Sequence, residues 1–154
     1  MKRVLFICLG NICRSPLAEF LLKDIVKQKG EESEWIIESR GTSDEEEGSF
    51  IYPLIRPYLD GKNIDYKNKR AKKISKEEYG KFDCIIGMER KNLIDAKRVF
   101  GEDEDNKLCL LLSFCGEEKD VADPWWTRDF DTAYKEILRG VNGVYKKLSE
   151  KKQS

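Results

Sequence analysis

Short apolar runs alternate along the chain with segments whose apolar residues recur at helical spacing. Apolar runs bounded by polar residues are typical of the buried strands of parallel sheets. The predicted strands lie at residues 3–8, 35–39, 82–88 and 107–114, and the predicted helices at about 16–30, 53–62, 89–100 and 129–152. Repeated strand–helix units predict an α/β fold in which a four-stranded, mainly parallel sheet has helices on both faces.

The first predicted helix has a defined start. Ser15 is expected to be its N-cap, and Pro16 is tolerated in the first helical turn because its missing N–H has no partner there. From Leu17 onward, apolar residues return every three or four positions until Gly30. A tight loop is therefore predicted between the strand that ends at Cys8 and this helix.

The length of 154 residues fits a single domain over residues 1–154. The 29 basic residues balance the 29 acidic ones, which gives no electrostatic case for a nucleic-acid or anionic-membrane partner. No apolar run approaches the roughly 18 residues that span a bilayer, and the N-terminal apolar run is too short for a signal peptide. We expect a cytoplasmic monomer that binds neither nucleic acid nor membranes.

The cysteine and histidine counts limit the chemistry. Five cysteines, an odd number in a chain of this size, favour free thiols in a reducing compartment. The sequence contains no histidine, which excludes Ser-His-Asp and Cys-His catalysis and every histidine-ligated metal site. A reactive cysteine in this chain must be activated without an imidazole.

The loop after the first strand carries residues suited to binding an anion. Ligands bind at the carboxyl ends of strands in α/β sheets, where successive backbone N–H groups and a helix N-terminus attract negative charge. Gly10 and Asn11 both tolerate the left-handed backbone conformations that such a loop uses. The planar fork of Arg14 suits two phosphate oxygens, and the same positive field stabilises a thiolate at Cys8. The Ser15 hydroxyl is expected to donate to that sulfur.

A Cys-x5-Arg spacing alone is weak evidence, since Cys8 by residue type is more often an inert core thiol. The wider segment 4–19, Val-Leu-Phe-Ile-Cys-Leu-Gly-Asn-Ile-Cys-Arg-Ser-Pro-Leu-Ala-Glu, resembles the signature of the low-molecular-weight protein tyrosine phosphatases. Ser39-Arg40-Gly41-Thr42, the segment 82–88 with Asn92, and Asp123-Pro124 also match that family. The resemblance implies a four-stranded parallel sheet, no cofactor and no metal.

The resemblance also implies a mechanism. Cys8 attacks the phosphorus of phosphotyrosine in proteins or peptides, Arg14 clamps the phosphate, and Asp123 acts as general acid and then as general base. By residue type alone, Asp123 would be interpreted as a turn residue before Pro124. The remaining phosphate-binding loop, which also holds inorganic phosphate or a similar oxyanion, comprises Leu9, Gly10, Asn11, Ile12, Cys13 and Ser15.

Loop support is the point where this chain departs from the family. The resemblance implies that Asn11 is braced by Ser15, Ser39 and a histidine, and Lys69 stands at that histidine position. Lysine offers donors but no acceptor, so we expect altered bracing and an altered acidity of the Cys8 thiol. The alternative is a solvated Lys69 with no such role.

Three features near the expected site have alternative interpretations. Trp125 and Trp126, directly after the acid loop, are expected to form a wall for a phenyl ring; the alternative is that they simply pack on the fold. Ile12, where phosphoarginine-specific relatives carry threonine, goes with tyrosine specificity. The acidic run 44–47 either is a solvated loop or disfavours acidic phosphopeptides.

The other cysteines give further alternatives. Cys13 either packs freely or forms a reversible disulfide with Cys8 that protects it from over-oxidation. Cys84, Cys109 and Cys115 are expected to be core thiols. A thiol-dependent arsenate reductase would need further cysteines after the third strand, and residues 88–107 contain none. A zinc or interaction module using Cys8, Cys13, Cys109 and Cys115 fits ordinary zinc spacings poorly and places Arg14 beside the metal.

Overall fold

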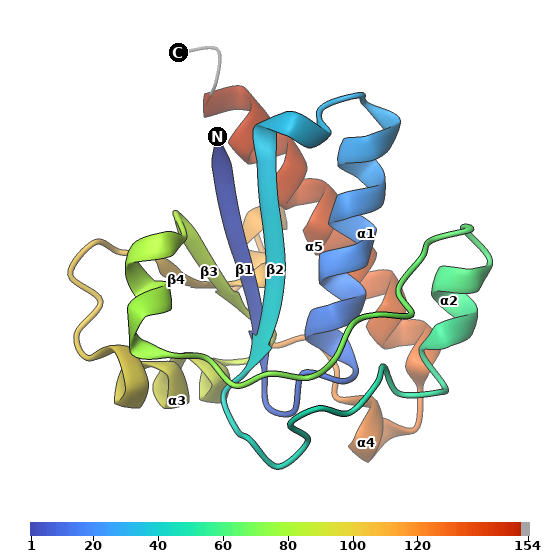
Figure 1. The fold of residues 1–154 in the computed structure, drawn as a ribbon, viewed down its shortest axis with the longest axis horizontal. Helices are drawn as coiled ribbons and strands as arrows, with labels where there is room; N and C mark the ends of the chain where they lie inside the picture. Colours follow the sequence, from blue (N-terminus) through green and yellow to red (C-terminus); the bar gives the residue numbers. More distant parts are fainter. Residues whose placement is uncertain (152–154) are drawn as a thin grey trace.

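A four-stranded parallel sheet forms the centre of the molecule (Figure 1). The computed structural model describes residues 1–151, and the predicted end of the last helix near residue 152 lies outside them. The strands are β1 (Lys2–Cys8), β2 (Trp35–Gly41), β3 (Cys84–Gly87) and β4 (Leu108–Leu110), in the order β2-β1-β3-β4. All three pairings are parallel, so the carboxyl ends of the strands share one edge.

Helices cover both faces of this sheet, as the sequence predicted. The long helices α1 (Arg14–Gln28) and α5 (Phe130–Lys151) lie side by side on one face, and α3 (Arg90–Phe100) lies on the other (Figure 1). Alternate side chains of β1 point to opposite faces, as the pleat requires. Val4 and Phe6 belong to the core with α1 and α5, whereas Leu5 and Ile7 pack with residues of α3.

The connecting segments contain shorter elements, some of which differ from prediction. Five short helical elements are present: η1 (Glu32–Glu34), α2 (Arg56–Asp60), η2 (Lys76–Lys81), η3 (Leu111–Cys115) and α4 (Pro124–Thr127). The helix predicted at 53–62 is therefore shorter than expected. The strand predicted at 107–114 ends at Leu110, because the chain turns there into η3, which packs against α5.

The start of α1 also corrects the sequence analysis. The helix begins at Arg14 and its N-cap is Cys13, whose carbonyl accepts a hydrogen bond from the Leu17 N–H at 3.2 Å. Ser15 lies inside the first turn and does not cap the helix. Its hydroxyl is instead within hydrogen-bonding distance of Cys8 and Asn11. The residue expected to start the helix thus faces the loop.

Helix α5 approaches η3 closely at two glycines. A Cβ atom placed on Gly143 would lie 2.7 Å from the Phe114 carbonyl oxygen, and one on Gly140 would lie 2.5 Å from Leu111 Cγ. Contacts that short do not occur between a real Cβ and a carbonyl oxygen. The two glycines therefore set the distance between α5 and η3. Over the described residues, no helix is long and apolar enough to cross a membrane.

Candidate active site

Residues 8–15 form a compact loop that leads from the end of β1 into the first turn of α1. Asn11 adopts a positive φ of 60°, the left-handed conformation expected at this position. Backbone hydrogen bonds from the segment after β2 hold the loop: Thr42 N–H donates to the Cys8 carbonyl at 2.9 Å, and Ser43 N–H to the Leu9 carbonyl at 3.0 Å. The loop is thus fixed by β1, by α1 and by the chain that leaves β2.

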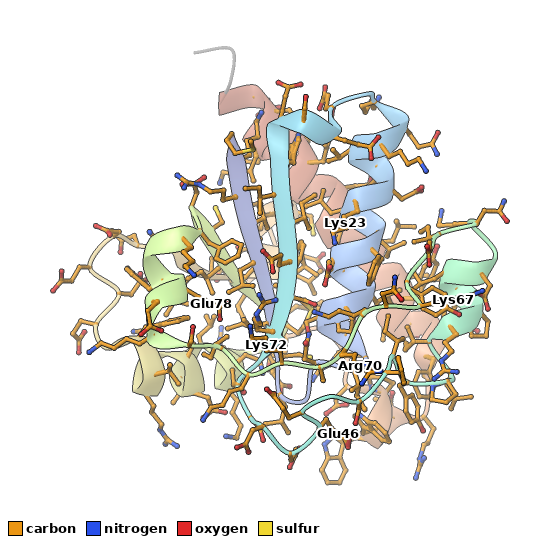
Figure 2. The ribbon with its side chains drawn as sticks, viewed as in Figure 1. Lys23, Glu46, Lys67, Arg70, Lys72 and Glu78 are labelled. Atoms are coloured by element: carbon orange, nitrogen blue, oxygen red, sulfur yellow. The ribbon has the colours of Figure 1, made fainter. Side chains whose placement is uncertain are left out.

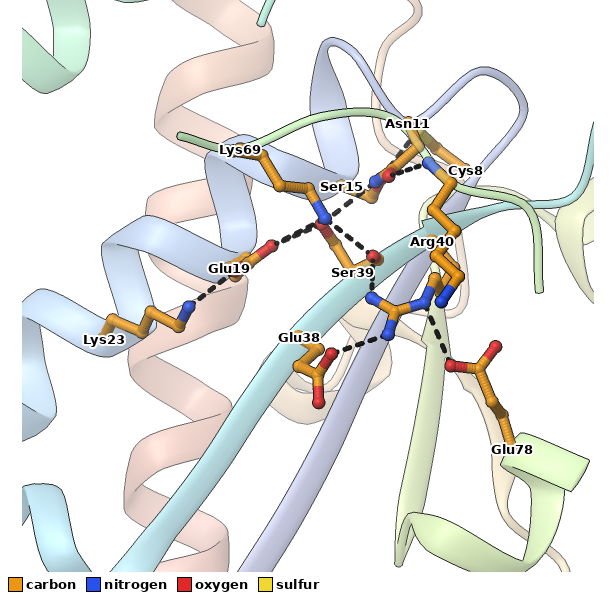
Figure 3. A network of polar contacts seen from close by, with 11 residues as sticks. Cys8, Asn11, Ser15, Glu19, Lys23, Glu38, Ser39, Arg40, Lys69 and Glu78 are labelled. Carbon is orange, nitrogen blue, oxygen red and sulfur yellow. Dashed lines mark hydrogen bonds and ion pairs between the residues drawn. The ribbon is translucent and has the colours of Figure 1, made fainter. Parts of the chain in front are cut away.

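A chain of side-chain hydrogen bonds supports Cys8 from inside the loop (Figure 3). Cys8 is 4% exposed, and its Sγ lies 2.9 Å from Ser15 Oγ. The amide of Asn11 donates to both Ser15 Oγ and Ser39 Oγ at 2.9 Å. Its Oδ1 accepts from the Lys72 backbone N–H at 3.1 Å, which fixes the orientation of the amide. The structure therefore brings together Cys8, Asn11, Ser15 and Ser39 as the sequence analysis expected.

This chain of hydrogen bonds continues to a buried carboxylate that the sequence analysis missed. Ser39 Oγ donates to Glu19 Oε1 at 2.5 Å, and Glu19 is only 3% exposed. Glu19 accepts a hydrogen bond from Lys23 at 2.6 Å and lies 3.4 Å from Lys69 Nζ (Figure 3). The sequence analysis included Glu19 only as the last residue of the family-like segment 4–19 and gave it no role, since its partners Ser39 and Lys69 come from β2 and the segment after α2.

Lys69 is a largely buried part of this network. Its ammonium group donates to the Ser39 carbonyl at 2.9 Å, and its side chain is 11% exposed. Burial lowers the pKa of Lys69 from its ordinary value, and the charge of Glu19 opposes that shift. This geometry does not fit the solvated alternative for Lys69.

Arg14 is held in place before any substrate binds. It is 5% exposed, and one guanidinium nitrogen donates to the Val121 carbonyl at 3.0 Å. The other terminal nitrogen lies 3.5 Å from Glu89 Oε1 and 3.8 Å from Asp123 Oδ2. Because a buried guanidinium requires compensating partners, these groups orient it toward the loop.

Asp123 lies at the start of α4, directly before Pro124. Its Oδ1 accepts a hydrogen bond from the Trp125 N–H at 3.0 Å, the geometry of a helix N-cap. Its Oδ2 faces Arg14, and its side chain is 22% exposed. The carboxylate is therefore accessible to a molecule bound at the loop.

A cavity of about 130 Å³ contains the three residues expected to be catalytic. The described residues that line it are Cys8, Leu9, Gly10, Asn11, Ile12, Cys13, Arg14, Glu45, Glu46, Glu89, Asp123 and Trp125. A larger hollow of about 420 Å³ lies between α1, β2 and residues 63–65, but neither Cys8 nor Arg14 lines it. The chemistry therefore assigns the smaller cavity as the site.

The two tryptophans differ in position. Trp125 lines the cavity, and its ring packs on Tyr52 with centroids 4.6 Å apart. Trp126 is 86% exposed and is not among the lining residues. Tyr52, which the sequence analysis did not single out, supports the one tryptophan that faces the site.

Cys13 differs chemically from Cys8 although both belong to the loop. Burial, with a contribution from neighbouring Cys8, raises the pKa of Cys13 to about 12 despite the opposing charge of Arg14. None of the five cysteines forms a disulfide in the structure. Within residues 1–151, no group of three or more cysteine, aspartate or glutamate side chains is arranged to hold a metal ion.

This fold, with a thiol, an arginine and a carboxylic acid around one small cavity at the carboxyl end of β1, is that of an enzyme acting on phosphate esters. Residues 3–154 match the family described as low molecular weight phosphotyrosine protein phosphatase. The chain therefore belongs to this family of phosphotyrosine phosphatases, which are hydrolases.

The similarity to known relatives extends over nearly the whole chain. The low molecular weight phosphotyrosine protein phosphatase of Gallus gallus is 34% identical over 149 residues, covering 90% of each chain. Among solved structures, the low molecular weight protein tyrosine phosphatase from Streptococcus pyogenes is 38% identical with a TM-score of 0.84, covering 96% of this chain and 93% of its own. YfkJ from Bacillus subtilis is 28% identical with a TM-score of 0.93, covering 99% and 97%.

Proposed function

We propose that the protein hydrolyses phosphotyrosine through a phosphocysteine intermediate, with Cys8 as nucleophile, Arg14 as phosphate clamp and Asp123 as general acid and base. The observation that carries this proposal is that the three side chains line one cavity, with Arg14 Nη2 3.8 Å from Asp123 Oδ2. Loop N–H groups and a guanidinium that are fixed beforehand stabilise the charge of the transition state without reorganising.

The first step forms the bond between Cys8 Sγ and phosphorus and breaks the bond between phosphorus and the tyrosine oxygen. Asp123 gives its proton to the departing phenolate, a role that an acid must fill in a chain without histidine. Ser15 stabilises the thiolate from 2.9 Å before attack. Arg14 and the loop amides hold the three equatorial oxygens throughout.

In the second step a water molecule forms the new bond to phosphorus and the sulfur–phosphorus bond breaks. Asp123, now ionised, takes the proton of that water, and inorganic phosphate leaves. The catalytic residues that this scheme requires are all side chains of the protein, so we propose that activity needs neither a metal nor a cofactor.

The test is hydrolysis of phosphotyrosine, phosphoserine and phosphoarginine in the presence of EDTA. We expect preferred turnover of phosphotyrosine, abolished by Cys8→Ser and lowered about 10²- to 10⁴-fold in kcat by Asp123→Ala. Preferred turnover of phosphoarginine would keep the mechanism and overturn the specificity inferred from Ile12. The mechanism would be contradicted if Cys8→Ser kept full activity, or if EDTA abolished the activity of the parent protein.

Trp125 and Trp126 provide a matched pair for the substrate wall. Trp125 lines the cavity and Trp126 is exposed outside it, so we expect Trp125→Ala to raise KM for phosphotyrosine several-fold and Trp126→Ala to change it less. Equal effects would assign both tryptophans to the wall, as the sequence analysis expected.

The cellular location, the partners and the oligomeric state of the protein are predictions. Five cysteines without a disulfide favour a reducing, cytoplasmic location. The balanced net charge favours a protein that acts without nucleic acid or membranes. Gel filtration with light scattering would test the predicted monomer.

A further inference from the structure

The cavity above the phosphate loop has an acidic rim. Among the described residues that line it, Arg14 is the one cation, and four side chains are carboxylic acids: Glu45, Glu46, Glu89 and Asp123. A bound phosphate group compensates the charge of Arg14. The segment that carries the phosphotyrosine must then lie beside carboxylates that have no cation left within the cavity.

The glutamates that extend this rim outward lie on a loop whose two ends are anchored. At one end, the N–H groups of Thr42 and Ser43 donate to carbonyls of the phosphate loop at 2.9 and 3.0 Å. At the other end, Gly48 N–H donates to the Ala71 carbonyl at 2.8 Å. These bonds fix the position of residues 44–47 relative to Cys8.

Glu46 lies directly against the phosphate loop. A Cβ atom placed on Gly10 would lie 3.3 Å from Glu46 Cγ, and Ser49 Oγ donates to Glu46 Oε2 at 3.3 Å. The neighbouring Glu45 is exposed and lines the same cavity. Both glutamates therefore line the cavity beside the phosphate loop, next to the space that a bound peptide must occupy.

The basic segment 67–73 does not neutralise this rim from within the cavity. Figure 2 shows Arg70 and Lys72 on the irregular segment that runs beside the loop that carries Glu46. Arg70 stacks over the Phe50 ring at 4.4 Å, and none of the lysines or arginines of this fully described segment lines the cavity.

We propose that Glu45 and Glu46, with Glu89, are specificity residues that select phosphotyrosine segments bearing lysine or arginine next to the phosphorylated residue. The proposal rests on the phosphotyrosine hydrolysis proposed above and adds the charge class of the substrate. Charges on the rim of a site speed association with substrates of the opposite charge and disfavour substrates of the same charge. Both effects become weaker as the salt concentration rises. Each pair of opposite unit charges about 6 Å apart in water raises the binding affinity about threefold.

The test compares two phosphotyrosine peptides that differ only in lysine or glutamate on both sides of the phosphotyrosine, with free phosphotyrosine as the reference. The variant E45Q/E46Q removes two rim charges, and D44N/E47Q removes the same number from the same loop at positions outside the cavity lining. We expect the parent to prefer the lysine peptide at least tenfold in kcat/KM at low salt. The preference should fall about five- to tenfold in E45Q/E46Q and stay within about twofold in D44N/E47Q.

The outcomes separate this inference from the proposed function. Two outcomes overturn the rim selectivity alone. In the first, free phosphotyrosine is hydrolysed but the two peptides are hydrolysed at equal rates. In the second, both double variants lose the preference for the lysine peptide equally. Absence of phosphotyrosine turnover overturns the proposed function, and the selectivity falls with it. A lysine preference that disappears in 0.5 M salt and in E45Q/E46Q, but persists in D44N/E47Q, supports the inference.

Discussion

Ser39 Oγ lies 2.5 Å from Glu19 Oε1, and this contact sets the direction of the hydrogen bonds that lead to Cys8. An ionised carboxylate only accepts, so the Ser39 hydroxyl must donate its single hydrogen to Glu19. Its oxygen is then free to accept from Asn11, whose second N–H goes to Ser15. The hydrogen of the Ser15 hydroxyl is thereby left for Cys8 Sγ, where it stabilises a thiolate.

Glu19→Gln should weaken both the fold and the reaction. The substitution leaves the largely buried Lys69 without its anion, which costs about 3 kcal/mol, and it allows Ser39 to turn its hydrogen away. We expect a lower urea midpoint and a kcat reduced about tenfold. Lys23→Ala, which removes the half-exposed partner of Glu19, should cost less than about 1 kcal/mol. Unchanged kcat in Glu19→Gln would show that the direction of these bonds does not matter for catalysis.

Lys69 should make stability rise with pH in the alkaline range. Burial places its folded-state pKa below the ordinary value of 10.5, so between these two values the unfolded chain binds more protons than the folded one. The contribution of Lys69 to the free energy of unfolding therefore increases as pH rises through that window. Groups with a raised pKa, such as Cys13, act in the opposite direction but contribute equally to both proteins, so urea unfolding in the alkaline range below pH 10.5 should show the stability of the parent relative to Lys69→Met rising with pH. The exposed Lys67→Met is the control and should follow the parent.

Cys13 should be unreactive at neutral pH. A pKa of about 12 leaves about one thiol in 10⁵ ionised at pH 7, and only the thiolate is a nucleophile. Brief treatment with iodoacetamide at pH 7, followed by peptide mapping, should modify Cys8 and spare Cys13. After peroxide treatment, a Cys8–Cys13 disulfide should form faster at pH 9 than at pH 7. A rate of disulfide formation that is independent of pH would show that ionisation of Cys13 does not limit this step.

Gly143→Ala should destabilise the contact between α5 and η3. The added Cβ would lie 2.7 Å from the Phe114 carbonyl oxygen, a backbone atom that cannot turn aside. We expect a loss of about 1–3 kcal/mol in urea unfolding, the usual cost of overpacking. Gly80→Ala, where a Cβ meets nothing within 4 Å, is the matched control and should be near neutral. Equal stabilities of the two variants would show that α5 shifts to accept the methyl group.

The site residues that lie close together in the sequence could be predicted from the sequence. Cys8, Gly10, Asn11 and Arg14 lie between one strand and one helix, so local spacing was enough to group them. The fold class followed for a similar reason, since each strand and long helix has its own periodicity. The predicted N-cap at Ser15 was wrong because its hydroxyl serves the loop, and tertiary contacts override local capping preferences.

Partners that come from distant segments could not be predicted in this way. Glu19, Glu89 and the Val121 carbonyl each contact a site residue across the fold, and nothing in their local sequence marks that contact. The same limit explains β4, which ends at Leu110 because the following residues pack on α5 as a 3₁₀ helix. Apolar residues at such a junction suit a strand and a buried turn equally well.

Val121 joins three parts of the active site through its backbone. Its N–H donates to the Met88 carbonyl at 2.8 Å, directly after β3, and its own carbonyl accepts from Arg14 at 3.0 Å. Asp123 follows only two residues later. The proposed proton donor and the proposed phosphate clamp are therefore attached to the same short stretch of chain. Moving residues 121–123 away from the loop would break the hydrogen bond that Arg14 donates to Val121, so we expect displacement of the acid to disturb the contact between Arg14 and phosphate.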